Sequence, residues 1–192
     1  MQTERQTQII EKSIELIADK GIQGFTIKNL SKSIGISEPA IYRHFESKTA
    51  ILINILNNFK EMGEMMSLII DNEDTAMEKI EFLFSKMLDI FTGQPAIVSV
   101  IFSEEIFKNE KILKEKIIEI HNMHQCNIEK IVSIGQAEKN VRTDIDKTTL
   151  ALILMGSLRL LVKRWDLNHH NFNLREEGKE LLNSFKLIIE QK

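Results

Sequence analysis

The chain contains few residues that break or cross-link helices. Only two of its 192 residues are proline and eight are glycine, so few positions force the backbone out of a helix. A single cysteine, Cys126, excludes an intramolecular disulfide and fits a reducing compartment. Valine is scarce, and no stretch alternates apolar and polar residues over the length of a strand. We therefore predict an all-α protein.

The chain also lacks a long hydrophobic run and a strong net charge. Its longest apolar stretch, residues 150–162, is interrupted by Arg159 and is shorter than the roughly 18 residues that a membrane span needs. The first ten residues contain no apolar segment typical of an export signal, so we expect a cytoplasmic protein. A net charge of −3 argues against wholesale coating of nucleic acid but permits a small basic patch.

Apolar residues recur at helical spacing along the whole chain. The expected helices cover residues 4–20, 27–34, 38–45, 48–70, 74–92, 95–107, 109–137, 146–167 and 174–191. Gly21 and Gly35 are expected to end the first two, because glycine adopts the left-handed conformation of a C-cap at low cost. Thr26, Ser37 and Ser47 are expected to cap the helices that follow them.

Two domains are expected. Residues 1–50 would form a three-helix helix-turn-helix DNA-binding domain, and residues 51–192 a larger helical domain for ligand binding and dimerisation. No flexible linker separates them, so we place the junction inside the long helix, around residues 54–59. A shared helix would couple the two parts mechanically.

Residues 26–48, TIKNLSKSIGISEPAIYRHFESK, contain two short helices separated by a tight turn. The turn at residues 35–37 makes them a helix-turn-helix candidate whose second helix can enter a major groove. Ile41 and Phe45 would point inward, which leaves polar and basic groups on the exposed face. The Lys48 ammonium lies at the start of the next helix, where free N–H groups favour a phosphate.

This stretch resembles the signature of tetracycline-repressor-type (TetR family) regulators. The resemblance is close over roughly the first 50 residues and extends beyond them only to length and all-helical layout. Ser31, Ser33 and Thr49 depart from the family pattern: small apolar residues are common at the first two positions, and an acid often follows the lysine. The matching positions are Gly21, Phe25, Thr26, Leu30, Ile34, Gly35, Ile36, Ser37, Ile41, Tyr42, His44, Phe45, Ser47 and Lys48.

The resemblance also implies which residues contact DNA. Residues expected to bind backbone phosphates are Thr26, Tyr42, His44 and Lys48. Residues at positions that usually face bases are Lys28, Glu38, Pro39, Ala40 and Arg43, and the DNA-binding set also includes Ser37. Their chemistry is compatible, since arginine or lysine can bond guanine, a carboxylate can accept from cytosine, and a methyl can touch thymine.

Each of these residues also has a plain structural interpretation. Tyr42 could be a packing residue, His44 an ordinary surface histidine, and Arg43 the partner of Glu38 or Glu46. Exposed ion pairs of the last kind contribute only about 0–1 kcal/mol. The full pattern favours DNA contacts.

Methionine and phenylalanine recur on the predicted middle helices. Core packing explains each of them singly, but adaptable methionine and aromatic walls together suit an apolar ligand cavity, which the family resemblance favours. Arg159, inside an otherwise apolar helix, would pair with an acid or receive a ligand carboxylate. The predicted pocket residues are Met62, Met66, Met87, Phe91, Phe102, Met123, Met155 and Arg159.

The last two helices resemble an interface: the helix at 146–167 is apolar around too much of its circumference for a monomer core, and the helix at 174–191 carries a second apolar stripe. Two such helices from each subunit would form the four-helix seam of a two-fold dimer, and Gly156 would permit close helix approach. The predicted interface residues are Leu154, Leu158, Leu161, Leu181, Phe185 and Ile188.

No catalytic or metal-binding arrangement is recognisable. His121 and His124 share a helix face, but Cys126 points away from both, so we expect no metal, no cofactor and no enzyme activity. We predict a ligand-responsive DNA-binding transcriptional regulator, most simply a repressor released from a palindromic operator by a small, largely apolar molecule. The expected partners are operator DNA, this effector and a second copy of the chain, with no membrane. The alternative is a DNA-bound protein-interaction factor of the same architecture without an inducer.

Overall fold

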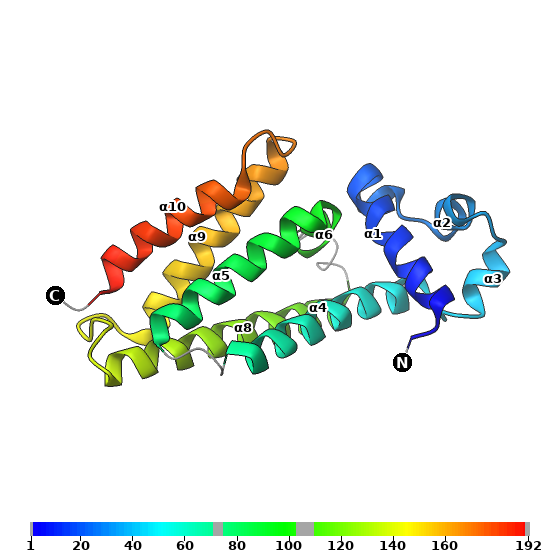
Figure 1. The fold of residues 1–192 in the computed structure, drawn as a ribbon. Helices are drawn as coiled ribbons and strands as arrows, with labels where there is room; N and C mark the ends of the chain where they lie inside the picture. The colour runs from blue at the N-terminus through cyan, green and yellow to red at the C-terminus, as the bar shows by residue number, and fades with distance from the viewer. Residues whose placement is uncertain (1, 71–74, 103–109, 191–192) are drawn as a thin grey trace. The chain divides into compact units, whose positions relative to one another are not determined.

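The computed structural model describes residues 2–70, 75–102 and 110–190, and these form α-helices joined by short connecting segments (Figure 1). Within them the only β-type pairing is one antiparallel bridge between Val141 and Glu190. The predicted all-α fold is confirmed, although parts of four predicted helices, at residues 74, 103–107, 109 and 191, lie outside the described residues. The helices are α1 (Glu4–Gly24), α2 (Ile27–Ile34), α3 (Glu38–Tyr42), α4 (Lys48–Ile70), α5 (Ala76–Gly93), α6 (Pro95–Ile101), α8 (Lys111–Ala137), α9 (Lys147–Leu167) and α10 (Leu174–Ile189).

The predicted end of the second helix at Gly35 is confirmed, whereas the first helix continues to Gly24 beyond a kink at Gly21. Regular helix in α1 stops at Gly21, whose φ of 64° and ψ of 178° form a combination that only glycine reaches readily; a short helical turn then continues to Gly24. The Thr26 hydroxyl caps α2 by accepting from the Asn29 N–H at 3.1 Å. Gly35 ends α2 in the left-handed conformation.

The helix after the turn is shorter than predicted, because α3 ends at Tyr42 rather than at Phe45. The His44 N–H donates to the Ile41 carbonyl at 2.9 Å, an i to i−3 bond that tightens the chain out of α-helical geometry. Ile41 and Phe45 are nevertheless buried, as predicted. The prediction that Ser37 caps α3 is wrong: Ser37 occupies the N-cap position, but its hydroxyl makes no capping hydrogen bond.

The chain divides into two compact units. The first contains residues 1–61 and 96–118, and the second contains residues 62–95 and 119–192. Helix α4 therefore contributes its first part to one unit and its last part to the other. The core of the first unit is apolar and includes Ile9, Ile17, Phe25, Leu30, Ile41, Phe45, Ile51, Ile55 and Leu56.

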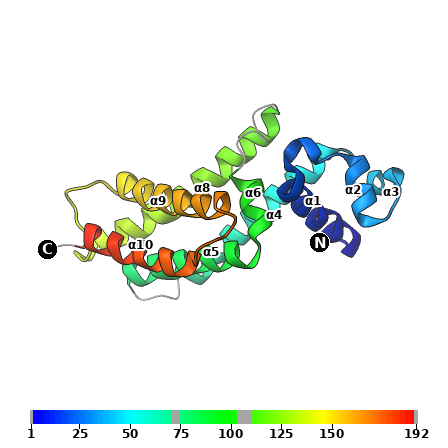
Figure 2. The ribbon, with the colours of Figure 1, turned by 90° about the horizontal axis from the view of Figure 1, so that it is seen from above.

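In the second unit α10 packs against both α5 and α9, as both views show (Figures 1 and 2). Gly178 allows α10 to approach α5 closely, because a Cβ at this position would lie 2.4 Å from Leu88 Cδ1. Exposed ion pairs flank this contact: Arg175 Nε lies 2.9 Å from Asp89 Oδ1, and the Lys186 ammonium bonds to a carboxylate on α5. Among the described helices, none combines the length and apolar content that a membrane crossing requires.

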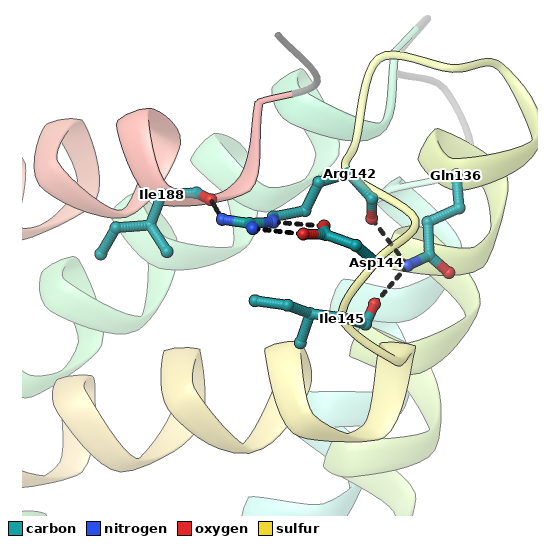
Figure 3. A network of polar contacts seen from close by, with 5 residues as sticks. All are labelled: Gln136, Arg142, Asp144, Ile145 and Ile188. Carbon is teal, nitrogen blue, oxygen red and sulfur yellow. Dashed lines mark hydrogen bonds and ion pairs between the residues drawn. The ribbon is translucent and has the colours of Figure 1, made fainter.

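A polar network holds the connection between α8 and α9 to the end of α10 (Figure 3). The Gln136 amide donates to the carbonyls of Arg142 and Ile145, both at 2.9 Å. The Arg142 guanidinium donates twice to Asp144, at 2.7 and 2.6 Å, and once to the Ile188 carbonyl at 3.0 Å. These bonds place a positive charge at the C-terminus of α10, where the helix dipole favours it. The hydrogen bonds from Arg142 also hold the pKa of Asp144 below its ordinary value.

Candidate functional site

The predicted DNA-contacting residues lie in the first unit, on α2 and α3, in the caps and short segments next to these helices, and at the start of α4. Tyr42 is 51% exposed, so its ring is not part of the core and the packing interpretation does not describe it. Among the described residues, no ion pair joins Arg43 to Glu38 or Glu46 within 4.0 Å. The exposed members are Thr26, Lys28, Ser37, Glu38, Pro39, Tyr42 and Arg43, and the half-buried ones are Ala40, His44 and Lys48.

Gln6, which the sequence did not indicate as part of this surface, bonds to the backbone at His44. The Gln6 side chain accepts from the Thr3 N–H at 3.0 Å, within the capping box that starts α1, and donates to the His44 carbonyl at 3.4 Å. Gln6 therefore ties the first turn of α1 to the segment that follows α3. The spacing of Thr3 and Gln6 predicts the capping box, but nothing in the local sequence indicates the contact with His44.

Lys48 is held at the N-terminus of α4. Its Nζ lies 3.5 Å from the Ile22 carbonyl oxygen and 5.1 Å from the centroid of the Phe25 ring. The Ser47 hydroxyl accepts from the Ala50 N–H at 3.1 Å, which confirms the predicted cap of α4. Burial lowers the pKa of Lys48, and the carboxylate of Glu110 opposes this shift.

Glu110 also makes a direct contact with α4. Its Oε1 accepts a hydrogen bond of 2.9 Å from the Thr49 hydroxyl, although the two residues are 61 positions apart in the chain. An anionic side chain therefore stands beside the lysine that is expected to bind a phosphate. The sequence does not predict this role for Glu110, because no local pattern links it to Thr49.

The predicted pocket residues differ in their surroundings. Phe91 is fully buried in the core of the second unit, and Phe102 belongs to the first unit. The side chain of Met66 lies outside the described residues. The remaining residues are half-buried on helices of the second unit: Met62, Met87, Met123, Met155 and Arg159.

The structure brings Met123 and His124 of α8 onto α4 at Gly63. A Cβ on Gly63 would lie 2.6 Å from His124 Cε1 and 2.9 Å from Met123 Cε, so these two side chains fill the space that a larger residue at position 63 would need. Burial, with a contribution from His121, lowers the pKa of His124 to about 4. His124 is therefore a neutral imidazole at neutral pH.

The predicted interface residues require a correction. Leu154, Leu158, Leu161 and Phe185 are buried within the single chain, and Leu181 is half-buried, so only Ile188 presents a large apolar surface. Because α9 is apolar on two faces, helical spacing did not show which face covers the chain's own core. The exposed apolar residues of α9 and α10 are instead Leu152, Ile153, Leu160, Leu167, Leu187 and Ile188.

Comparison with known proteins agrees with this geometry. Residues 9–55 match the model of bacterial regulatory proteins of the tetR family, and residues 76–190 match the C-terminal region of MAATS-type transcriptional repressors. The fatty acid metabolism regulator protein of Bacillus subtilis (strain 168) is 26% identical over 171 residues, covering 87% of this chain and 86% of the relative. The nucleoid occlusion factor SlmA of Aliivibrio fischeri (strain MJ11) is 24% identical over 157 residues, 80% of each chain.

A solved structure shows the same fold. The transcriptional regulator FadR from Bacillus subtilis, solved in complex with stearoyl-CoA, superposes with a TM-score of 0.81 at 23% identity, covering 93% of this chain and 96% of that one. The matching C-terminal family model alone spans more than half of the chain. The residues around Tyr42 and Lys48 thus lie in the helix-turn-helix part of a known architecture, and this chain belongs to the TetR family of DNA-binding transcriptional regulators.

Proposed function

We propose that this protein is a repressor that binds a palindromic operator as a homodimer and is released by a ligand with an acyl chain. The observation that carries the proposal is the exposure of Tyr42 and Arg43 at the end of α3, in the same unit as the capped N-termini of α2 and α4. A helix as short as α3 buries only Ile41, so most of its side chains are available to a partner.

The polar groups of this surface suit two kinds of DNA contact. Thr26, Tyr42, His44 and Lys48 supply hydroxyl, imidazole and ammonium groups for backbone phosphates, which position a protein without reading sequence. Lys28, Ser37, Glu38, Pro39, Ala40 and Arg43 face the groove in this proposal. Arg43 is the strongest candidate for base readout, because a guanidinium can bond both O6 and N7 of guanine.

The proposed dimerisation is supported by the exposed apolar residues of α9 and α10. Leu152, Leu160 and Leu167 recur about every two turns on α9, with the exposed Gly156 between the first two. A Cβ on Gly156 would meet no atom within 4 Å, so the chain's own packing does not require glycine there. A second copy of α9 and α10 would cover this surface and give the two-fold symmetry that a palindrome requires.

The proposed effector is suggested by the relatives. The Bacillus subtilis relative is a fatty acid metabolism regulator, and the superposed structure holds stearoyl-CoA. Half-buried methionines on α4, α5, α8 and α9 provide adaptable apolar contacts for such a chain. The protein would have two arrangements, one that binds DNA and one that does not. The ligand must have the higher affinity for the second arrangement, because only a difference in affinity shifts the equilibrium. We propose that a shift of α4 transmits this difference.

A second candidate function is a DNA-bound factor that acts through a protein partner. It is favoured by the similarity to SlmA, which is named a nucleoid occlusion factor. The two candidates share the DNA-binding surface and differ in whether a small molecule releases it.

Both can be tested with a labelled duplex from the region beside the protein's own gene and a scrambled duplex, each at two salt concentrations. We expect selective binding that Tyr42→Ala with Lys48→Ala weakens at least about tenfold, since charged hydrogen bonds are worth about 1.5–3 kcal/mol. Lys130→Ala, an exposed lysine on α8, is the control. Equal binding to both duplexes, or no loss in the double variant, would contradict the DNA-contact proposal.

The effector is tested on the same complex. Stearoyl-CoA should lower the affinity for the selective duplex, whereas free CoA should not. Selective DNA binding that is insensitive to long-chain acyl-CoA and free fatty acid would exclude the acyl effector and favour the second candidate.

A further inference from the structure

The contact between Thr49 and Glu110 brings a negative charge close to the proposed DNA-binding residues. Glu110 places a carboxylate at the N-terminal turn of α4, where the free N–H groups and the helix dipole favour an anion. The same turn carries Lys48, the expected phosphate ligand. An intramolecular anion therefore occupies surroundings that a DNA phosphate would also favour.

The position of this carboxylate depends on a segment other than α4. The N–H groups of Leu113 and Lys114 both bond to the Glu110 carbonyl at 3.1 Å, so Glu110 starts the first turn of α8 and moves with it. Thr49 and Lys48 move with the first turn of α4. The hydrogen bond thus joins the first turns of two helices within the first compact unit.

The residue at position 49 explains why an acid from another helix can occupy this place. Thr49 stands where the family pattern often has an acid directly after the lysine. In this chain the acid beside Lys48 comes instead from Glu110, and the Thr49 hydroxyl holds it. A carboxylate attached to α4 would have a fixed influence on Lys48, whereas one attached to α8 has an influence that changes with the separation of the two helices.

We propose that Glu110 is a regulatory anion that weakens phosphate binding at the N-terminus of α4, so that a movement of the first turn of α8 changes operator affinity. This inference rests on the proposed role of Lys48 in DNA binding. Approach of Glu110 to Lys48 lowers the affinity by repelling the phosphate and competing for the ammonium. Withdrawal of Glu110 raises it.

The test is the affinity of Glu110→Gln for the gene-adjacent duplex and the scrambled duplex, measured by fluorescence anisotropy at low salt. The control is Glu115→Gln, which makes the same charge change on an exposed side chain of α8 that lies 3.7 Å from Lys111. We expect Glu110→Gln to bind both duplexes about three- to tenfold more tightly than the control, because a phosphate contact does not depend on sequence. The gain should shrink as salt rises, and it should vanish in a Lys48→Met background.

Several outcomes would overturn the proposal. Equal affinities of Glu110→Gln and Glu115→Gln would show that the carboxylate does not act on DNA. Weaker binding by Glu110→Gln would show that Glu110 positions Lys48 productively. A gain that survives in the Lys48→Met background would assign the effect to another group. If the wild-type protein fails to distinguish the two duplexes, the proposed operator function fails, yet a gain on both duplexes would still support the role of Glu110.

Discussion

Gly135 near the end of α8 offers a sharp test of how the second unit is packed. A Cβ at this position would lie 2.5 Å from Val141 Cγ2, 2.8 Å from Ala76 Cβ and 2.9 Å from Asn140 Oδ1. The Ala76 atom is fixed to the backbone of α5 and cannot rotate away. The loop atoms are also restrained, because the N–H groups of Asn140 and Val141 both bond to the Gly135 carbonyl at 3.0 Å. Gly135→Ala therefore requires a backbone shift.

The expected effect of Gly135→Ala is the difference between two terms. Overpacking a well-packed site costs about 1–3 kcal/mol, and the fixed Ala76 atom places this site toward the upper end. Replacing glycine by alanine inside a helix returns about 0.5–1 kcal/mol. We expect a net loss of about 2 kcal/mol, which corresponds to a fall in Tm of about 4–8 °C for a chain of this size.

The assay is thermal unfolding followed by circular dichroism at one protein concentration, because dimerisation would make Tm depend on concentration. Gly93→Ala at the end of α5 is the matched control, since a Cβ there meets no atom within 4 Å. The control should retain the wild-type Tm or exceed it slightly. A Gly135→Ala variant as stable as the wild type would refute the reasoning, and equal losses in both variants would show that the close contact is not the cause.

Three further predictions follow from single groups. His124 has a pKa of about 4 in the folded protein against an ordinary 6.5. The unfolded state therefore binds the proton first, and the free energy of unfolding falls by up to about 3 kcal/mol as pH drops from 6.5 toward 4. Urea unfolding should show a weaker pH dependence for His124→Gln than for the exposed control His169→Gln. Asp144→Asn should lower Tm at pH 7, and the difference from wild type should close as pH falls below 3.8, the ordinary pKa of this carboxyl, because its folded value is lower still and protonation then weakens the bonds from Arg142. Leu160→Glu should convert the proposed dimer to a monomer, as measured by light scattering. A Leu160→Glu variant that remains dimeric would show that this surface of α9 is not part of the interface.

The parts of the fold that the sequence predicts are those controlled by near neighbours. The caps at Thr26 and Ser47 and the breaks at Gly21 and Gly35 depend on hydrogen bonds or backbone angles within four residues. The failure at Ser37 has the same origin, since a capping residue type does not guarantee that its hydroxyl faces the free N–H groups. Helical periodicity predicts the remaining helices for the same local reason.

Features that depend on distant segments could not be predicted. Helix α9 is apolar on two faces, and only its packing in the folded chain decides that Leu154 is buried while Leu160 is 68% exposed. The contact of Met123 and His124 with Gly63 could not be predicted either, because a glycine in the sequence can equally mark the end of a helix. The DNA-contacting residues were accessible because their spacing resembles a known pattern within one short stretch.

Two of the contacts that distant segments make with the proposed DNA surface have a chemistry that predicts opposite effects. Gln6 and His44 are joined across 38 positions by a bond between neutral groups, whereas Thr49 and Glu110 bring a charge across 61 positions. Gln6→Ala should weaken DNA binding by about two- to tenfold, because one neutral hydrogen bond is worth about 0.5–1.5 kcal/mol. This loss should persist as salt rises, unlike the gain expected for Glu110→Gln. Thr3→Ala, which loses only the hydroxyl side of the capping box, is the control; an equal loss in that variant would assign the effect to the start of α1 rather than to the contact with His44.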